Sequence, residues 1–182
     1  MSCVLASCRT NWEIPMKRIL FLLSFFATVA QASEGTPIAV PAGHTAVMTA
    51  LGAGDLTYEC RAKAGMPDAY EWAFAGPTAI LYDKNKAAVG KYYGGPTWEA
   101  NDGSKVTGKQ LAVHPSPTPA SIPHQLVQAN PATGSGMMSG ITYIQRINTQ
   151  GGVAPADSCS AANAGAKKMV KYQADYVFYK AS

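Results

Sequence analysis

The feature that most constrains the fold of this chain is a strict alternation of apolar and polar side chains near its end. Apolar residues occupy every second position of this run, at Val170, Tyr172, Ala174, Tyr176 and Phe178. A period of two residues is typical of a strand with one buried face, because successive side chains point to opposite sides. The pattern therefore predicts a terminal strand in the middle of a sheet.

The same alternation recurs earlier in the chain. Residues 55–62 place Leu56, Tyr58 and Cys60 on one face, and residues 70–75 repeat the pattern with aromatic side chains. Further short strands are predicted over residues 37–40, 46–51, 79–82, 87–93, 97–100, 104–107, 111–113 and 141–149. Turn residues separate these runs, which predicts a chain of short antiparallel strands.

Several glycine and proline clusters predict where the strands end. We expect turns at residues 52–54, at Gly76-Pro77 and at residues 94–96. Residues 101–103 end in Asp-Gly, a strong signal for a hairpin with a type I′ turn. The proline-rich residues 114–119 predict a surface connection, since proline cannot donate to a strand ladder.

One segment, residues 122–129, has the character of a short helix of two turns at most. Residues 131–140 are expected to form a loop and residues 153–166 an irregular segment that holds Cys159, and strands and turns are predicted for most of the remaining residues after position 36. The expected fold class is all-β, an antiparallel β-sandwich or barrel with at most one or two short helices.

The N-terminal residues have the pattern of an export signal. Lys17 and Arg18 precede an apolar run over residues 19–29, and Ala30-Gln31-Ala32 matches a small-residue cleavage site. We therefore expect residues 1–32 to be a leader, with Met16 as the true start, and residues 33–182 to form one domain. The apolar run is too short for a transmembrane segment. The expected location is exported, either periplasmic or extracellular.

Removal of this leader changes the charge and cysteine count. It takes away three basic residues and one acid, so the formal charge falls from +4 to +2. The remainder has no basic stripe of the kind that binds nucleic acid. Two cysteines remain, Cys60 and Cys159, and in an exported chain such a pair predicts a disulfide. The alternative is two free buried thiols.

Six motifs are spread along the chain: Y-E-C at 58–60, W-x-F-x-G-P-x-A-x-L at 72–81, G-P-T-W-E-A-x-D-G-S at 95–104, Y-I-Q-R-I-N-T-Q-G-G at 143–152, A-P-A-D-S-C at 154–159 and Y-Q-A-D-Y-V-F-Y at 172–179. Together they resemble the motifs of the DUF3455 family, a group of exported proteins without an assigned activity. The chain departs from the family pattern at Tyr92, where the family usually has histidine, and at His124, where it often has tryptophan. The resemblance implies a compartment and a shared fold, and no reaction.

The window 89–104 holds the candidate ligand-binding residues. Tyr92, Tyr93 and Trp98 are candidates for a platform on which a sugar or another planar ligand stacks, the alternative being core packing. Tyr92 and Tyr93 must point to opposite faces of a strand. Glu99 and Asp102, three residues apart, are a candidate pair of carboxylates, since paired carboxylates can act as acid and base in glycoside cleavage. The alternative for Asp102 is that its side chain stabilises the turn.

The remaining polar residues do not indicate a metal site, a cofactor site or a recognisable catalytic set. His44, His114 and His124 lack a short metal-ligand spacing, so no metal site is predicted. Nucleophile-elbow and dinucleotide-binding motifs are missing from the sequence, so no cofactor is predicted. Arg146 is expected in a buried structural network with Asp175 or Glu99, the alternative being a substrate contact.

Three functions remain compatible with the sequence. The first is an exported binding or envelope-associated module for a glycan or small molecule. The second is a hydrolase-like enzyme that uses Glu99 or Asp102 with His114 or His124. The third is a purely structural secreted protein, in which the aromatic side chains of window 89–104 are buried and no ligand-sized pocket exists. Because a catalytic set is not recognisable, we expect binding rather than catalysis.

Overall fold

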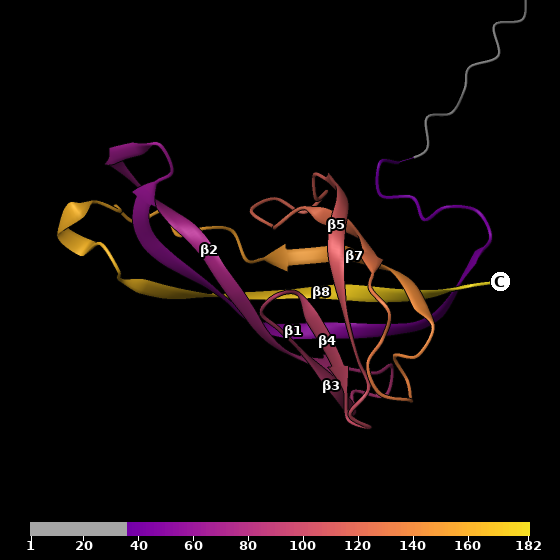
Figure 1. Cartoon of the computed structure of the whole chain (residues 1–182). Coiled ribbons are helices and arrows are strands. Elements are labelled where there is room, and N and C mark those ends of the chain that lie inside the picture. Colours follow the sequence, from indigo (N-terminus) through magenta and orange to yellow (C-terminus); the bar gives the residue numbers. More distant parts are fainter. Residues whose placement is uncertain (1–35) are drawn as a thin grey trace, which may run out of the picture. The chain divides into compact units, whose positions relative to one another are not determined.

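Each strand of the protein pairs with the next one along the chain, and the last strand returns to pair with the first (Figure 1). A computed structural model describes residues 36–182, so the predicted leader over residues 1–32, including its start at Met16, lies outside the described residues. The described residues form eight strands: β1 (His44–Lys63), β2 (Met66–Tyr82), β3 (Ala88–Tyr93), β4 (Thr97–Ala100), β5 (Lys105–His114), β6 (His124–Ala129), β7 (Ile141–Gly151) and β8 (Lys167–Ala181).

All eight pairings are antiparallel and close into a single barrel. The one short helix of the described residues is a 3-10 turn, η1 (Ala161–Asn163). The predicted all-β antiparallel fold is therefore confirmed, as a barrel rather than a sandwich. In residues 36–182 no helix is long and apolar enough to cross a membrane.

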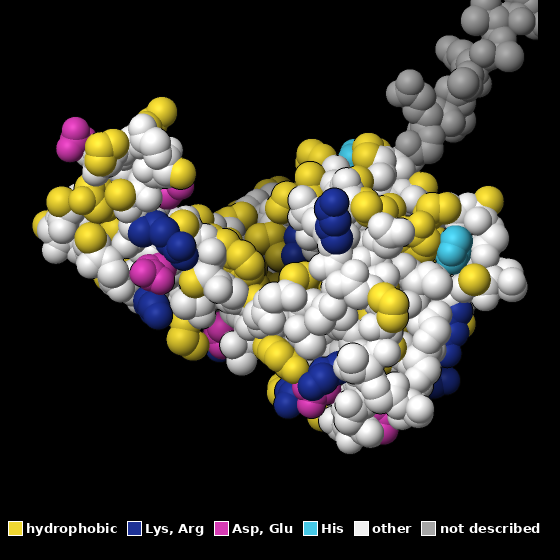
Figure 2. Space-filling model, viewed as in Figure 1, with side chains coloured by type: hydrophobic (Ala, Val, Ile, Leu, Met, Phe, Trp, Pro, Cys, Tyr) yellow, Lys and Arg dark blue, Asp and Glu magenta, His cyan; other side chains and the backbone are white. Residues whose placement is uncertain are grey.

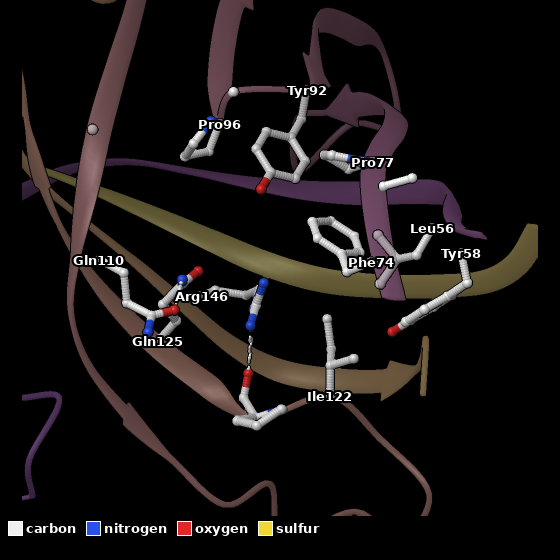
Figure 3. A pocket seen from close by; sticks show the side chains of 15 residues that line it. Leu56, Tyr58, Phe74, Pro77, Tyr92, Pro96, Gln110, Ile122, Gln125 and Arg146 are labelled. Atoms are coloured by element: carbon white, nitrogen blue, oxygen red, sulfur yellow. Dashed lines mark hydrogen bonds between the residues drawn. The ribbon is translucent and has the colours of Figure 1, made fainter. Parts of the chain in front are cut away.

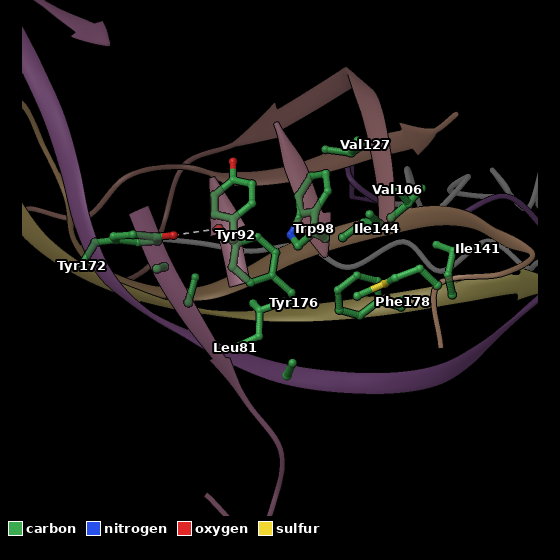
Figure 4. Packing of buried hydrophobic residues seen from close by; sticks show 14 of the residues in the cluster. Leu81, Tyr92, Trp98, Val106, Val127, Ile141, Ile144, Tyr172, Tyr176 and Phe178 are labelled. Atoms are coloured by element: carbon green, nitrogen blue, oxygen red, sulfur yellow. Dashed lines mark hydrogen bonds between the residues drawn. The ribbon is translucent and has the colours of Figure 1, made fainter. Parts of the chain in front are cut away.

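Large aromatic side chains fill the inside of the ring (Figure 4). Trp98, Tyr176 and Phe178 are fully buried. The ring of Tyr92 stacks on Trp98 with centroids 4.8 Å apart, and Tyr176 meets Trp98 edge-on at 5.7 Å. The face of β8 predicted to be buried points into this core, which confirms that alternation identified the strand correctly.

Two predicted turns prove to be strand interior. β1 continues through residues 52–54, where a Cβ on Gly52 would lie 2.5 Å from Cε2 of Tyr176. Glycine is needed here because the tyrosine ring lies against the strand backbone. β2 likewise continues through Gly76 and Pro77. Proline is tolerated at an open strand edge, and the pairing of β2 with β3 begins one residue later, at Thr78.

The predicted helix over residues 122–129 is wrong, since most of this segment is strand β6. Its neighbouring residues Leu126 and Val127 are both buried, although they point to opposite faces. Val127 belongs to the barrel core. Leu126 lies beside Gln145 of β7, whose Nε2 donates a 2.6 Å hydrogen bond to the carbonyl of Ile38. Because the segment before β1 covers this outer face, the burial pattern loses its two-residue period.

That segment also departs from the prediction of a strand over residues 37–40. It forms a turn in which the N–H of Ala39 donates to the carbonyl of Thr36. The side chain of Ile38 is buried, with 5% of its surface exposed. The segment therefore contributes to the fold by covering the barrel rather than by joining the sheet.

The predicted hairpin between β4 and β5 has a different turn from the expected type I′. Of its three loop residues, Gly103 has a positive φ of 84°, whereas Asn101 and Asp102 do not. The N–H of Ala100 donates to the carbonyl of Ser104, and the N–H of Gly103 donates to that of Ala100. This is the pattern of a three-residue loop with glycine in the left-handed conformation.

The end of β1 and the start of β2, residues 56–77, pair with each other and extend beyond the ring as an arm (Figure 1). The predicted disulfide joins Cys60 of this arm to Cys159, with Cα atoms 5.5 Å apart. Nε1 of Trp72 donates a 2.8 Å hydrogen bond to the carbonyl of Asp157, and Lys168 pairs with the Asp157 carboxylate. The irregular segment 153–166 is thus held to the arm covalently and by polar contacts.

Candidate ligand-binding site

A pocket of about 400 Å³ lies where the β1–β2 arm leaves the rest of the ring. Figure 2 shows hydrophobic side chains gathered around a hollow between the arm and the barrel. Residues from six strands and two connections line it, among them Leu56, Phe74, Tyr92, Ile122, Gln125 and Arg146. The pocket forms because β2 and β3 pair only over the last residues of β2, so the ring opens beside the arm.

The walls of the pocket are mainly apolar. Leu56, Phe74 and Pro77 come from the arm, and Ile122 comes from the connection before β6 (Figure 3). Phe74 is 54% exposed, although it is a large aromatic residue, and meets Tyr58 edge-on with centroids 5.8 Å apart. An exposed phenylalanine over an apolar hollow provides a surface that a hydrophobic ligand would bury.

Tyr92 reaches the pocket from β3, and its hydroxyl points into it (Figure 3). One face of its ring is covered by Trp98, and Tyr176 lies 5.1 Å away, centroid to centroid. Burial raises the pKa of the Tyr92 phenol, while the charge of Arg146 and the Tyr176 hydroxyl act in the opposite direction. The hydroxyl therefore stays neutral near neutral pH and can donate a hydrogen bond to a ligand.

A pair of glutamines lies on the polar side of the pocket. Nε2 of Gln125 donates a 2.5 Å hydrogen bond to Oε1 of Gln110 across the β5–β6 pair. On the arm side, the hydroxyl of Tyr58 donates a 2.6 Å hydrogen bond to the carbonyl of Gly152. These contacts fix polar side chains at two edges of an otherwise apolar cavity.

Arg146 brings a positive charge into the pocket from β7. Its Nε and Nη2 donate hydrogen bonds of 3.3 and 2.9 Å to the carbonyl of Pro123 (Figure 3). Among residues 36–182, no carboxylate lies within 4.0 Å of its guanidinium. The side chain is half-buried. Within residues 36–182 the guanidinium thus has a single carbonyl partner and lies between the glutamine pair and the apolar wall of the pocket (Figure 3).

The predicted network of Arg146 with Asp175 or Glu99 is therefore wrong. Asp175 instead accepts a 2.8 Å hydrogen bond from Asn148. Register shifts interrupt the β7–β8 pairing between Ile141 and Tyr143 and again after Ile147. These irregularities change which residues of β7 face the core, so that Ile144 is fully buried and Arg146 faces the pocket.

Two of the aromatic candidates lie inside the barrel and one lies outside. Tyr92 lines the pocket, and Trp98 lies behind it with no exposed surface. Tyr93 points to the opposite face, where its hydroxyl donates a 2.5 Å hydrogen bond to Oε2 of Glu99. Lys91 pairs with the same carboxylate at 3.2 Å. Glu99 thus has two partners outside the pocket, and the hydrogen bond from Tyr93 is the main cause of its lowered pKa.

The side chain of Asp102 stabilises the turn after β4. Its carboxylate accepts hydrogen bonds from the N–H and the hydroxyl of Ser104, at 2.9 and 2.5 Å. The N–H of Met137 donates to the same carboxylate at 2.7 Å, which joins the turn to a distant loop. These hydrogen bonds, that from the Ser104 hydroxyl first, lower the pKa of Asp102.

The histidines do not converge with the two carboxylates. His114 and His124 face each other across the β5–β6 pair, whereas Glu99 and Asp102 have the separate partners described above. His44 meets Tyr143 edge-on at 4.7 Å. In the described part of the chain, no three His, Cys, Asp or Glu side chains are grouped in a way that could hold a metal ion. Glu99 and Asp102 therefore do not share a site with His114 or His124, as the hydrolase hypothesis requires.

Sequence reasoning missed most of the pocket. The alternation over residues 70–75 places Phe74 on one face with Tyr70 and Trp72 but does not indicate a pocket, and Gln110 and Gln125 carry no recognisable signal. For Arg146, a polar residue within a predicted strand, the sequence favours a structural network and leaves a substrate contact as the alternative. These residues meet because the sheet closes into a ring, and their spacing along the chain does not reveal that closure.

Comparison with known proteins supports the relationship that the motifs suggested. The family described as "Protein of unknown function (DUF3455)" matches residues 41–180. No curated protein and no solved structure matches the chain. The family match includes strands β1 to β8 almost in full, together with both disulfide cysteines. On this evidence the chain belongs to the DUF3455 family.

Proposed function

We propose that this protein binds a small organic molecule in the pocket beside the β1–β2 arm. The observation that carries the proposal is the exposed ring of Phe74 above a cavity of about 400 Å³. Phe74 differs from an isolated exposed apolar residue because it lies over a cavity whose walls are themselves mainly apolar. Binding of a ligand would remove this surface from water and gain free energy from its burial.

The composition of the cavity wall supports a ligand with a substantial apolar part. Small-molecule sites have volumes of about 300–1,000 Å³ and are mostly apolar, with a few polar groups that orient the ligand. The pocket has this character, since Leu56, Pro77 and Ile122 form an apolar wall near the polar ends of Tyr92 and Arg146. Sugar stacking is less favoured, because one face of the Tyr92 ring is already covered by Trp98.

Export of the protein is part of the same proposal. The leader pattern over residues 1–32 and the Cys60–Cys159 disulfide support a function in an oxidising compartment, periplasmic or extracellular. N-terminal sequencing of protein recovered outside the cytoplasm tests this, with Ser33 as the expected first residue. A protein that stays in the cytoplasm with its leader attached would contradict it.

The binding proposal is tested by filling the pocket. Gln110→Phe adds a ring at a pocket-lining position, and Leu111→Phe adds a ring to the neighbouring residue, which is exposed and does not line the pocket. The neutral fluorescent probe N-phenyl-1-naphthylamine should bind wild type and Leu111→Phe equally and bind Gln110→Phe more weakly. Absence of binding to wild type, or equal binding to all three proteins, would contradict the proposal.

A further inference from the structure

We infer that the pocket selects an organic anion, a carboxylate attached to an apolar aromatic or aliphatic body, and that Arg146 binds the carboxylate. The inference rests on the proposed binding function and narrows the class of ligand. It follows from the position of Arg146, the partners of the carboxylates and the apolar surface on one side of the guanidinium.

Arg146 has hydrogen-bonding capacity that the protein does not use. A guanidinium carries five N–H donors in a planar fork. Within the described residues its hydrogen bonds go from Nε and Nη2 to one acceptor, the carbonyl of Pro123. That contact holds one edge of the guanidinium and leaves the remaining donors, including both on Nη1, for another partner. A carboxylate is the partner that fits a planar fork best.

The acids of the described chain do not neutralise this charge. Asp55 pairs with Lys171 at 2.9 Å, Glu99 pairs with Lys91, and Asp175 accepts its hydrogen bond from Asn148. Removing a cation from water without a counter-ion is unfavourable, and a bound anion offsets that cost. The arrangement in residues 36–182 therefore favours a negatively charged ligand over a neutral or positive one.

The rest of the pocket provides a place for the apolar body of the ligand. Figure 3 shows Phe74, Leu56 and Ile122 on one side of the Arg146 guanidinium, with the hydroxyl of Tyr92 pointing into the same space. A ligand with its carboxylate at Arg146 would place its hydrocarbon part against Phe74. The neutral phenol of Tyr92 is a second donor for the carboxylate, and a positive charge on the ligand would be repelled.

The experiment compares two probes of nearly equal shape, 1-naphthaleneacetate and 1-naphthaleneacetamide, by titration calorimetry. Because hydrogen bonds to charged groups are stronger than neutral ones, wild type should bind the carboxylate about tenfold or more tightly than the amide. Arg146→Met should reduce the affinity for the carboxylate to that for the amide, and leave amide binding nearly unchanged. Arg146→Lys keeps the charge without the planar fork and should retain part of the preference.

A matched control removes the same charge elsewhere. Lys84 lies exposed in the turn between β2 and β3 and does not line the pocket, so Lys84→Met should keep the full preference for the carboxylate. Circular dichroism checks that each variant keeps the strand spectrum of the wild type.

The outcomes separate this inference from the broader proposal. If wild type binds both probes equally, or if Lys84→Met abolishes the preference as fully as Arg146→Met, anion selection by Arg146 is overturned and small-molecule binding stands. If wild type binds neither naphthalene probe and also fails to bind the neutral probe N-phenyl-1-naphthylamine, both the proposed function and the inference are overturned.

Discussion

The hydroxyl of Tyr58 donates a 2.6 Å hydrogen bond to the carbonyl of Gly152, 94 residues away in the sequence. Tyr58 belongs to the pocket wall, and Gly152 begins the segment that reaches the disulfide at Cys159. The carbonyl of Gly151 accepts a further hydrogen bond from the N–H of Ile122, another pocket residue. The arm, the disulfide-bonded segment and the pocket wall are thus one connected unit.

The Tyr58–Gly152 contact should contribute measurably to stability. Tyr58→Phe keeps the ring and leaves the buried carbonyl of Gly152 without its partner. We expect the free energy of unfolding to fall by about 1–3 kcal/mol, the cost of an unsatisfied buried polar group. Urea denaturation of the two proteins measures the difference. Equal unfolding midpoints would show that the hydrogen bond has no net effect.

The disulfide should stabilise the fold by restricting the unfolded chain. Cys60 and Cys159 are separated by 99 residues, and closing a loop of about 100 residues is worth up to about 4.7 kcal/mol in the chain-entropy model. The double variant Cys60→Ala, Cys159→Ala should therefore unfold at a lower urea concentration than the oxidised protein. Adding reductant should destabilise wild type and leave the double variant unaffected. A wild type insensitive to reductant would contradict this.

Gly52 should be intolerant of any side chain, because its position faces the ring of Tyr176. A Cβ there would lie 2.5 Å from Cε2 of that ring, so Gly52→Ala should cost about 1–3 kcal/mol through overpacking. Gly94→Ala is the control, since among the described residues a Cβ there meets no atom within 4 Å. Thermal unfolding followed by circular dichroism compares the two. Equal effects of both substitutions would contradict the packing described for the barrel core.

The pKa of His124 should lie below that of an ordinary histidine. Burial is the main cause, followed by the charges of His114 and Arg146, and each disfavours the protonated ring. As the pH falls below about 6.5, the unfolded chain binds a proton first. The free energy of unfolding should therefore decrease as the medium becomes more acidic through this range, and His124→Gln should reduce that decrease.

Nuclear magnetic resonance follows the same titration directly. The ring protons of His124 should titrate at a lower pH than those of an unfolded peptide. Arg146→Met should raise the midpoint, because it removes one of the repelling charges. A midpoint at the ordinary value in wild type would contradict the effect of burial and of the neighbouring charges on this ring.

The sequence predicted the strands whose surroundings are simple. β8 has the core on one face along most of its length, so its alternation was visible and correctly identified Tyr172, Tyr176 and Phe178 as inward-facing. The cysteine pair was predictable for a similar reason, since Cys60 continues the alternation of β1. In both cases the alternation is visible because the same face of the strand is buried along its length.

Strands that are covered on both faces, or whose register shifts along their length, were predicted less well. In β6, Val127 faces the core while Leu126 is covered from outside, so the segment lacks the two-residue period that identifies a strand. In β7, register shifts move Arg146 to the pocket face, which alternation alone cannot reveal. Gly52 suggested a turn, although its role is to make room for Tyr176. Each error arises from a tertiary contact that local sequence does not encode.

The most direct test of the account is a titration of isotope-labelled protein with 1-naphthaleneacetate, followed residue by residue by nuclear magnetic resonance. We expect the perturbed signals to cluster at the pocket, on Phe74, Tyr92, Gln125 and Arg146. Signals of Glu99 and Asp102, which have their partners outside the pocket, should stay unchanged. Perturbations centred on the Glu99–Asp102 turn, or none at saturating probe, would contradict the placement of the binding site.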